Sequence, residues 1–130
     1  MKLVRRSQAP KDTFEAPYER TVSHMITPWT VGSEHLWIGV VEYPVGSKSN
    51  AHTHEDLEEA FYCVSGTGQI RVNDKVFDIE SGDAVYVAPG EEHAVINNGI
   101  KTLELVSTVS PPLSPTMFKS SGVTGEQTSY

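Results

Sequence analysis

One stretch of the sequence is the most informative about the fold and the site, namely Gly46-Ser-Lys-Ser-Asn-Ala-His52-Thr-His54-Glu-Asp-Leu-Glu-Glu59-Ala-Phe-Tyr-Cys-Val-Ser-Gly66. His52 and His54 are two residues apart, and side chains at that spacing point to the same face of an extended strand. Both imidazoles therefore converge on one point. Glu59 follows and opens the apolar run Ala60 to Val64. The stretch predicts nitrogen and oxygen ligands gathered beside a strand.

A third imidazole comes from His93, which follows the turn signal Pro89-Gly90. Three imidazoles and one carboxylate suit iron, manganese, nickel, zinc or copper better than calcium or magnesium, which prefer oxygen ligands. A single histidine is more often a surface or core residue than a ligand. His24 and His35 have no partner at ligand spacing, so we expect them to lie outside the site.

The remaining chain is typical of an all-β protein. Short apolar runs alternate with turn signals rich in Gly, Pro, Asn and Ser, and many short strands at even spacing indicate a sandwich or barrel. Asn73-Asp74 predicts a two-residue hairpin loop, because both residues tolerate a positive φ. The predicted strands are Leu36 to Tyr43, Ala60 to Val64, Gln69 to Val72, Val76 to Ile79, Ala84 to Val87, Ala94 to Ile96 and Leu103 to Val109.

Length and charge set limits on the function. The chain has 130 residues, enough for one domain, and a net charge of -7. An acidic chain argues against a nucleic-acid or anionic-membrane partner, which needs a basic surface. No apolar run is long enough for a membrane span, and the N-terminus has no signal-peptide core. The single cysteine, Cys63, cannot form an intrachain disulfide, so we expect a cytoplasmic protein.

The joint pattern of the two motifs resembles the cupin superfamily. The first cupin motif is a Gly, five residues, His-x-His, a Glu after three or four more residues, and a Gly after six more, and Gly46 to Gly66 fits every interval. The second motif is a Gly, five residues, Pro-x-Gly, two residues, His, three residues and Asn, and Gly82 to Asn97 fits it. Ala88 stands where the family has its first Pro, and Pro89 beside it still sets a rigid turn.

The resemblance implies a double-stranded β-helix, the small jelly-roll barrel of cupins. It also implies that His52, His54, Glu59 and His93 bind one divalent transition metal in the barrel mouth. The expected organisation is an N-terminal arm over residues 1–35 that packs on the barrel or on a partner, a barrel over 36–118 and a polar tail over 119–130. We also expect a two-fold symmetric homodimer.

The six residues between Glu59 and Gly66 select Glu59, rather than the adjacent Glu58, as the ligand. Alternation then places Phe61 and Cys63 on the inner face, with Val95 beside His93, so these three are candidates for lining the pocket. Cys63 is expected to be a small buried hydrophobe, with a reactive thiol as the alternative. The alternation places Ala60, Tyr62 and Val64 on the outer face. For residues 36–43 the sequence does not predict which of the two faces points inward.

Four protein ligands leave two positions of an octahedral shell for substrate or oxygen. We therefore expect a metal-dependent enzyme that acts on a small oxygenated metabolite, with dioxygenase chemistry preferred. A non-redox isomerase, lyase or decarboxylase is the alternative, and a metabolite-binding protein without turnover is the third. Glu58 and Glu92 are expected to be solvated charges rather than an acid and a base, so no catalytic residue beyond the metal ligands is assigned.

Overall fold

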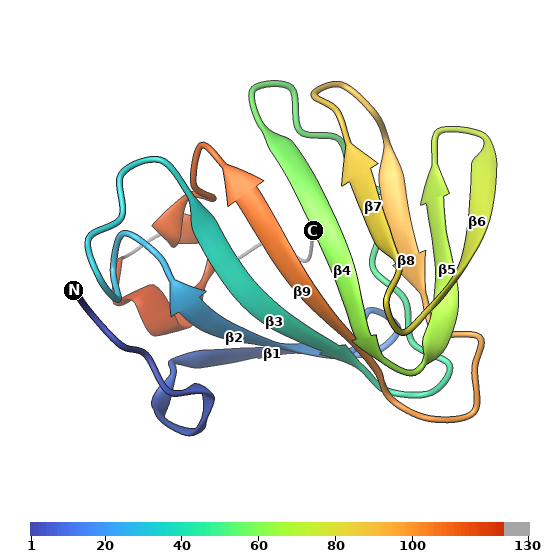
Figure 1. The fold of residues 1–130 in the computed structure, drawn as a ribbon, viewed down its shortest axis with the longest axis horizontal. Helices are drawn as coiled ribbons and strands as arrows, with labels where there is room; N and C mark the ends of the chain where they lie inside the picture. Colours follow the sequence, from blue (N-terminus) through green and yellow to red (C-terminus); the bar gives the residue numbers. More distant parts are fainter. Residues whose placement is uncertain (124–130) are drawn as a thin grey trace.

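The computed structural model describes residues 1–123 and shows two antiparallel sheets that face each other (Figure 1). The larger sheet has six strands in the order β1-β2-β3-β9-β4-β7, and the smaller has three in the order β6-β5-β8. The strands are β1 Lys11–Phe14, β2 Arg20–Ile26, β3 Trp37–Tyr43, β4 Glu58–Ser65, β5 Thr67–Val72, β6 Lys75–Glu80, β7 Ala84–Val87, β8 His93–Ile96 and β9 Leu103–Ser110.

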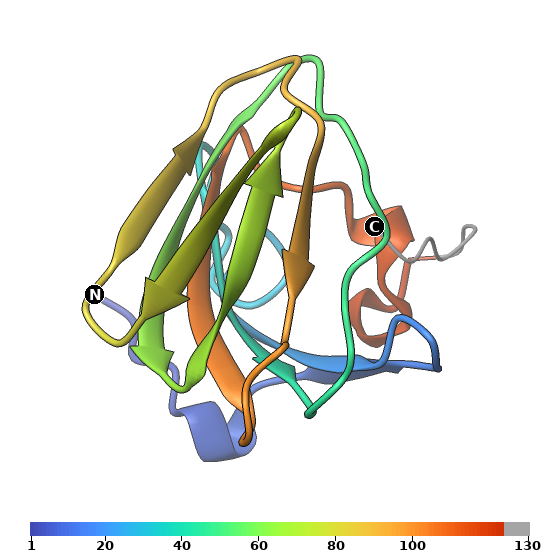
Figure 2. The same cartoon turned by 90° about the vertical axis from the view of Figure 1, so that its right-hand side faces the viewer.

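The two sheets form the walls of a barrel, and Figure 2 shows the smaller sheet lying across the larger one. β1 to β4 all lie in the larger sheet, and from β4 onward the chain crosses between the sheets, so β4 and β5 belong to different sheets although only Gly66 separates them. Gly66 has a φ of +86°, and a Cβ there would lie 2.5 Å from the carbonyl oxygen of Thr102. Only glycine fits this corner without strain. The topology agrees with the jelly roll expected from the sequence.

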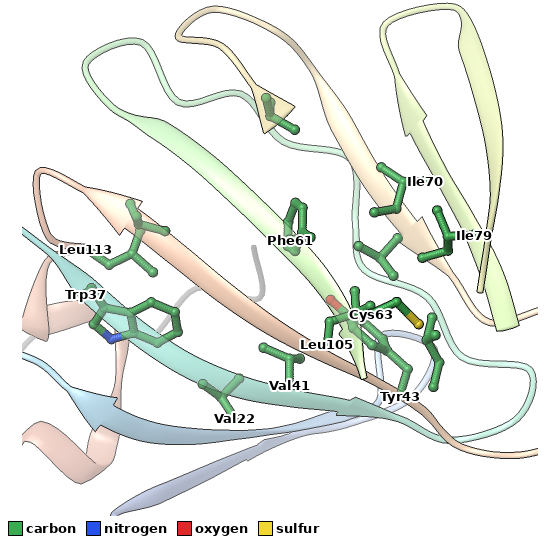
Figure 3. Close-up of a cluster of buried hydrophobic side chains, with 14 of the residues drawn as sticks. Val22, Trp37, Val41, Tyr43, Phe61, Cys63, Ile70, Ile79, Leu105 and Leu113 are labelled. Atoms are coloured by element: carbon green, nitrogen blue, oxygen red, sulfur yellow. The ribbon is translucent and has the colours of Figure 1, made fainter. Parts of the chain in front are cut away.

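Side chains from both sheets fill the barrel interior (Figure 3). Alternate residues of β3, from Trp37 to Tyr43, are buried, so this odd-numbered set is the inner face that the sequence left open. Phe61 and Cys63 of β4 also point inward, and Tyr62 and Val64 are exposed, as alternation predicts. The core therefore contains the inward apolar side chains of β3 and β4, and the smaller sheet covers them from the other side.

All seven predicted strands are present, with ends within two residues of the predicted bounds. The hairpin at Asn73-Asp74 is also confirmed: Asn73 has a φ of 53° between β5 and β6. Asn97, the last residue of the second motif, has a structural role, because its Nδ2 donates to the carbonyl oxygens of Tyr43 and Lys101.

The N-terminal region extends the larger sheet. β2 pairs with β3, and β1 pairs with β2 at the sheet edge. The alternation of β2 was hard to see in the sequence because Arg20 and His24 are buried among its inward positions. Each is compensated: the Arg20 guanidinium lies 4.2 Å from the centre of the Phe14 ring, and His24 bonds Asp12.

The C-terminal segment folds back onto β1 through two short 3-10 helices, η2 at Pro115–Met117 and η3 at Lys119–Ser121. Phe118 stacks on Trp37, with ring centroids 6.1 Å apart. Ser120 donates to Asp12 from both its backbone nitrogen and its hydroxyl. Residues 119–121 of the predicted tail are therefore packed on the barrel, and the expectation for residues 124–130 lies outside the described part of the chain. Among the described residues, no helix is long and apolar enough to cross a membrane.

Candidate metal centre

Four side chains meet at the end of the barrel where β4 and β8 begin. Glu59 comes from β4 in the larger sheet and His93 from β8 in the smaller one, and His52 and His54 come from the segment that precedes β4. One potential ligand atom from each residue lies within 4.8 Å of all the others. The structure thus brings together all four residues that the cupin resemblance implied.

Backbone hydrogen bonds hold the histidine segment against β8. His52 and His93 form an antiparallel bridge, in which each backbone nitrogen donates to the other residue's carbonyl oxygen, at 3.1 and 2.9 Å. The carbonyl oxygen of His54 accepts from the nitrogen of Gly90 at 2.8 Å. The Pro89-Gly90 turn of the second motif therefore also holds the His52 to His54 segment of the first motif in place.

Two of the imidazoles are oriented by carbonyl groups two residues upstream. Nδ1 of His52 lies 2.9 Å from the carbonyl oxygen of Asn50, and Nδ1 of His93 lies 3.0 Å from that of Glu91. A carbonyl oxygen only accepts, so both Nδ1 atoms carry the proton. Nε2 is then the atom that each ring offers to a metal, which is the common arrangement of ligating histidines.

Glu59 is almost fully buried, with 2% of its surface exposed, and both of its oxygens are engaged. Oε1 lies 3.1 Å from Nε2 of His93 and 3.8 Å from Nε2 of His54. Oε2 accepts a hydrogen bond of 2.7 Å from the hydroxyl of Ser107 on β9. Oε1 is therefore the oxygen that faces the imidazoles.

The electrostatics of the cluster favour a carboxylate at Glu59 beside neutral imidazoles at His52 and His54. Burial and, to a smaller extent, the neighbouring His93 lower the pKa of His52 to about 4. Burial also lowers the pKa of His54. Burial alone would raise the pKa of Glu59, but the hydrogen bonds from His93 and Ser107 outweigh it and lower the pKa. Burial alone would lower the pKa of His93, but the hydrogen bonds to Glu59 and to the Glu91 carbonyl outweigh it and raise the pKa.

The donor set fits a divalent transition metal. Ligand atoms about 2.1 Å from a common ion lie about 3.0 Å apart when they are adjacent in an octahedron and about 4.2 Å apart when they are opposite. The four atoms, which all lie within 4.8 Å of one another, therefore have to move closer together around an ion. Three nitrogens and one oxygen match the preferences of iron, manganese, nickel, copper and zinc.

A small cavity extends from the cluster into the barrel. Its volume is about 10 Å³, room for about one water molecule. Its walls are partly apolar and partly polar: they are formed by Arg20, Val41, Tyr43, Ser49, His52, Glu59, Phe61, Val95 and Ser107. Phe61 and Val95 thus line a space next to the ligands, and their contact with a substrate stays a prediction.

A second hollow of about 560 Å³ lies between the free edges of β6 and β7. Phe77, Val85 and Tyr86 are among its walls, and none of the four cluster residues is. This groove is therefore separate from the candidate metal centre.

The other residues singled out from the sequence lie outside the cluster. His35 is exposed, and His24 is buried between Trp37 and Asp12. Glu58 and Glu92 are exposed, and Glu92 pairs with Arg71 at 3.1 Å. Cys63 is buried in the core, where its Sγ lies 3.7 Å from the carbonyl oxygen of Gly66. Burial raises the pKa of this thiol, which disfavours the reactive thiolate.

Sequence analysis did not identify Ser107, the residue that bonds Glu59. Ser107 lies 48 positions from Glu59 and outside both motifs. Its only signal was that it is the one polar residue among the inward positions Leu103, Leu105, Ser107 and Val109 of its strand. A hydroxyl at an inward position of a strand needs a partner, and that expectation was the available clue.

Two relatives illustrate the similarity of this chain to proteins of known sequence. An uncharacterised protein of Methanocaldococcus jannaschii is 34% identical over 71 residues, which cover 55% of this chain and 57% of the relative. The tetracenomycin polyketide synthase protein TcmJ of Streptomyces glaucescens is 28% identical over 87 residues, 67% of this chain and 58% of TcmJ. The match thus spans less than two thirds of the length of either relative.

Solved structures show the same fold. The crystal structure of a predicted oxalate decarboxylase from Thermotoga maritima superposes with a TM-score of 0.75 at 24% identity, over 85% of this chain and 98% of that one. The family model of the cupin domain matches residues 39–109, more than half of the chain and the part that contains all four cluster residues. The chain therefore belongs to the cupin family.

Proposed function

We propose that the protein is a divalent-metal-dependent enzyme that acts on a small oxygenated metabolite. The observation that carries the proposal is the convergence of three imidazoles and one carboxylate within 4.8 Å. Structural zinc sites are usually closed and tetrahedral, whereas four protein ligands in an octahedral shell leave two adjacent positions for other molecules. This arrangement supports catalysis better than a structural role for the metal.

The residues of the chain have distinct tasks in this proposal. His52, His54 and His93 bind the metal through neutral nitrogens, and Glu59 supplies a negative charge that offsets part of the ion's charge. A bound divalent ion polarises an oxygen of the substrate as a Lewis acid. The apolar walls Phe61 and Val95 exclude bulk water, which strengthens electrostatic interactions inside the barrel.

One of the similar proteins favours chemistry without a net redox step. One similar structure is described as a predicted oxalate decarboxylase, and TcmJ takes part in polyketide synthesis according to its name. We therefore propose Lewis-acid chemistry on a carboxylate, carbonyl or enolate group first. The preference for a dioxygenase drawn from the sequence stays a prediction, and so do the identity of the metal and the cytoplasmic location.

We also propose that the protein is a homodimer whose copies meet through the outer face of the larger sheet. Tyr62 and Tyr86 are 50% and 57% exposed, and the exposed Ala60 and Ala84 pair with Tyr86 and Tyr62 in the ladder between β4 and β7. Val64 continues the patch along β4 and is 42% exposed. A contiguous apolar patch of this kind supports a self-complementary contact between two copies.

The test of the enzymatic proposal uses the protein loaded separately with iron, manganese, nickel, zinc and copper. Each form is incubated with small diketones, sugar phosphates, dicarboxylates and hydroxylated aromatic acids, in air and under nitrogen. Turnover that continues under nitrogen with zinc or manganese agrees with Lewis-acid chemistry. Turnover that requires iron and consumes oxygen would establish the dioxygenase instead. Tight binding of a compound with no turnover in any form would favour the metabolite-binding alternative.

A further inference from the structure

We propose that Ser107 is a positioning residue that divides the two oxygens of Glu59 between protein and metal. Its hydroxyl holds Oε2, so that Glu59 presents only Oε1 to the ion. The inference rests on the proposed function, because it presumes that a divalent metal binds to the four-residue cluster.

The contact between Ser107 and Glu59 is short and shielded from water. The Ser107 hydroxyl donates to Oε2 at 2.7 Å, and the two residues are 1% and 2% exposed. They lie on neighbouring strands, where Glu59 pairs with Val109 and Phe61 pairs with Ser107. The two inward side chains therefore meet diagonally across the ladder, within the reach of a carboxylate and a hydroxyl.

The other oxygen faces the imidazoles. Oε1 lies 3.1 Å from Nε2 of His93 and 3.8 Å from Nε2 of His54, on the side of the carboxylate that Ser107 does not contact. A charge-assisted O–H···O⁻ bond is among the stronger hydrogen bonds of a protein. A metal that used both oxygens would have to displace this bond from Oε2.

The consequence concerns how many positions stay open on the ion. With Oε1 alone, the cluster supplies four ligand atoms, and two of six octahedral positions remain for other molecules. With both oxygens of Glu59, the cluster would supply five, and only one position would remain. Ser107 thus preserves the second open position without contacting the metal itself.

The neighbouring strand β3 places no side chain directly opposite Ser107. Ser107 pairs on its other side with Gly39 of β3, which has no side chain, and the ring of Trp37 fills the space above Gly39. Ser107 and Glu59 also both line the cavity beneath the cluster, beside Phe61.

The experiment compares the binding of Co²⁺ by the full-length wild-type protein and two variants, Ser107→Ala and Ser107→Cys. Cysteine has nearly the size of serine but is a weak donor, so it tests the same loss if the alanine variant fails to fold. Affinity is measured by competition with a coloured chelator, and the visible absorption of bound Co²⁺ reports its coordination number. The matched control is Ser23→Ala, because Ser23 is also fully buried and its hydroxyl has no hydrogen-bond partner among residues 1–123.

Both Ser107 variants are expected to bind Co²⁺ about 10- to 100-fold more weakly, as is usual when the partner of a metal ligand is removed. Their visible spectra should also differ from the wild-type spectrum, because Glu59 is free to rotate or to bind through both oxygens. Ser23→Ala should match the wild type in affinity and spectrum.

Two failures are distinguishable. Wild-type protein that binds no Co²⁺ would overturn the proposed function and this inference with it. Wild-type protein that binds Co²⁺ while folded Ser107 variants match it within about twofold and keep its spectrum would overturn only the role of Ser107.

Discussion

Oε1 of Glu59 and Nε2 of His93 lie 3.1 Å apart, although the two residues belong to different sheets. β4 carries Glu59 in the six-stranded sheet, and β8 carries His93 in the three-stranded sheet. The candidate metal centre therefore spans the interior of the barrel, and its geometry depends on how the two sheets face each other. A metal bound there would link the sheets, so metal binding and stability of the fold are coupled.

Alanine at any of His52, His54 or His93 should lower the affinity for a divalent metal by more than about 100-fold, which exceeds the usual cost of losing only a ligand's partner, while the barrel stays folded. Glu59→Ala should have a smaller effect than the histidine variants, because three imidazoles still hold an ion, but an effect at least as large as that of the Ser107 variants, which act through Glu59. Metal content after dialysis, measured by elemental analysis, checks each variant, and circular dichroism confirms folding. The matched control is Glu58→Ala, since Glu58 is exposed next to Glu59. If Glu58→Ala emptied the site and Glu59→Ala did not, the ligand assignment would be wrong by one residue.

Tyr43 should make the protein less stable above pH 10. Burial raises its pKa to about 12, from about 10 in the unfolded chain. The folded state therefore holds the phenol proton more tightly, so this contribution is complete below pH 10 and is lost as the pH rises from 10 to 12. The slope due to one such group is about 1.4 kcal/mol of unfolding free energy per pH unit. Urea denaturation of wild type and Tyr43→Phe at several pH values measures it; equal slopes for the two proteins would refute the prediction.

Asp12→Ala should destabilise the fold by about 3 kcal/mol, because the carboxylate accepts from Nε2 of His24 and from Ser120 inside the structure. Trp37 donates to Nδ1 of His24, so Nε2 carries the proton and needs its acceptor. Urea denaturation measures the change. Asp78→Ala serves as the control, since Asp78 accepts one exposed hydrogen bond from Gln69 and should cost less than about 0.5 kcal/mol. Equal effects of the two substitutions would show that the buried network contributes little.

A charge at the centre of the outer patch should separate the two copies of the proposed dimer. Tyr62→Asp places a carboxylate in the middle of the face through which the two copies would meet. The mass from light scattering should therefore change from about 29 kDa for the wild type, twice the chain mass, to 14.3 kDa for the variant. Val76→Asp, on an exposed position of β6 in the other sheet, is the control and should leave the mass unchanged. A wild-type mass of 14.3 kDa would contradict the dimer.

Much of the fold was predictable because its strands carry regular alternation or lie between strong turn signals. β3 and β4 alternate cleanly, and glycines mark the corner at Gly66 and the turn before β7. β2 was not predictable as a strand, since it buries Arg20 and His24 where apolar residues are expected. The partners of these two side chains, Phe14 and Asp12, lie on β1, and no local pattern of the sequence reveals the pairing.

The candidate site likewise contains residues that the sequence predicts and residues that it does not. Its four ligand residues lie in two motifs with fixed spacing, so they were identifiable before the structure. Ser107 and the carbonyl groups of Asn50 and Glu91 orient those ligands, and they were not identifiable. A carbonyl is present in every residue and a serine in many strands, so only the three-dimensional arrangement shows which of them contact the site.

The most direct test of the central claim is the metal content of the protein purified without chelators or an affinity metal, expressed as equivalents per chain. We predict about one equivalent of iron, manganese, nickel, copper or zinc, bound through the four-ligand set. Its removal by a chelator should be reversible, and it should be absent from His93→Ala. A metal content near zero that added ions do not restore would contradict the account, because it would mean that the three imidazoles and Glu59 meet without forming a metal site.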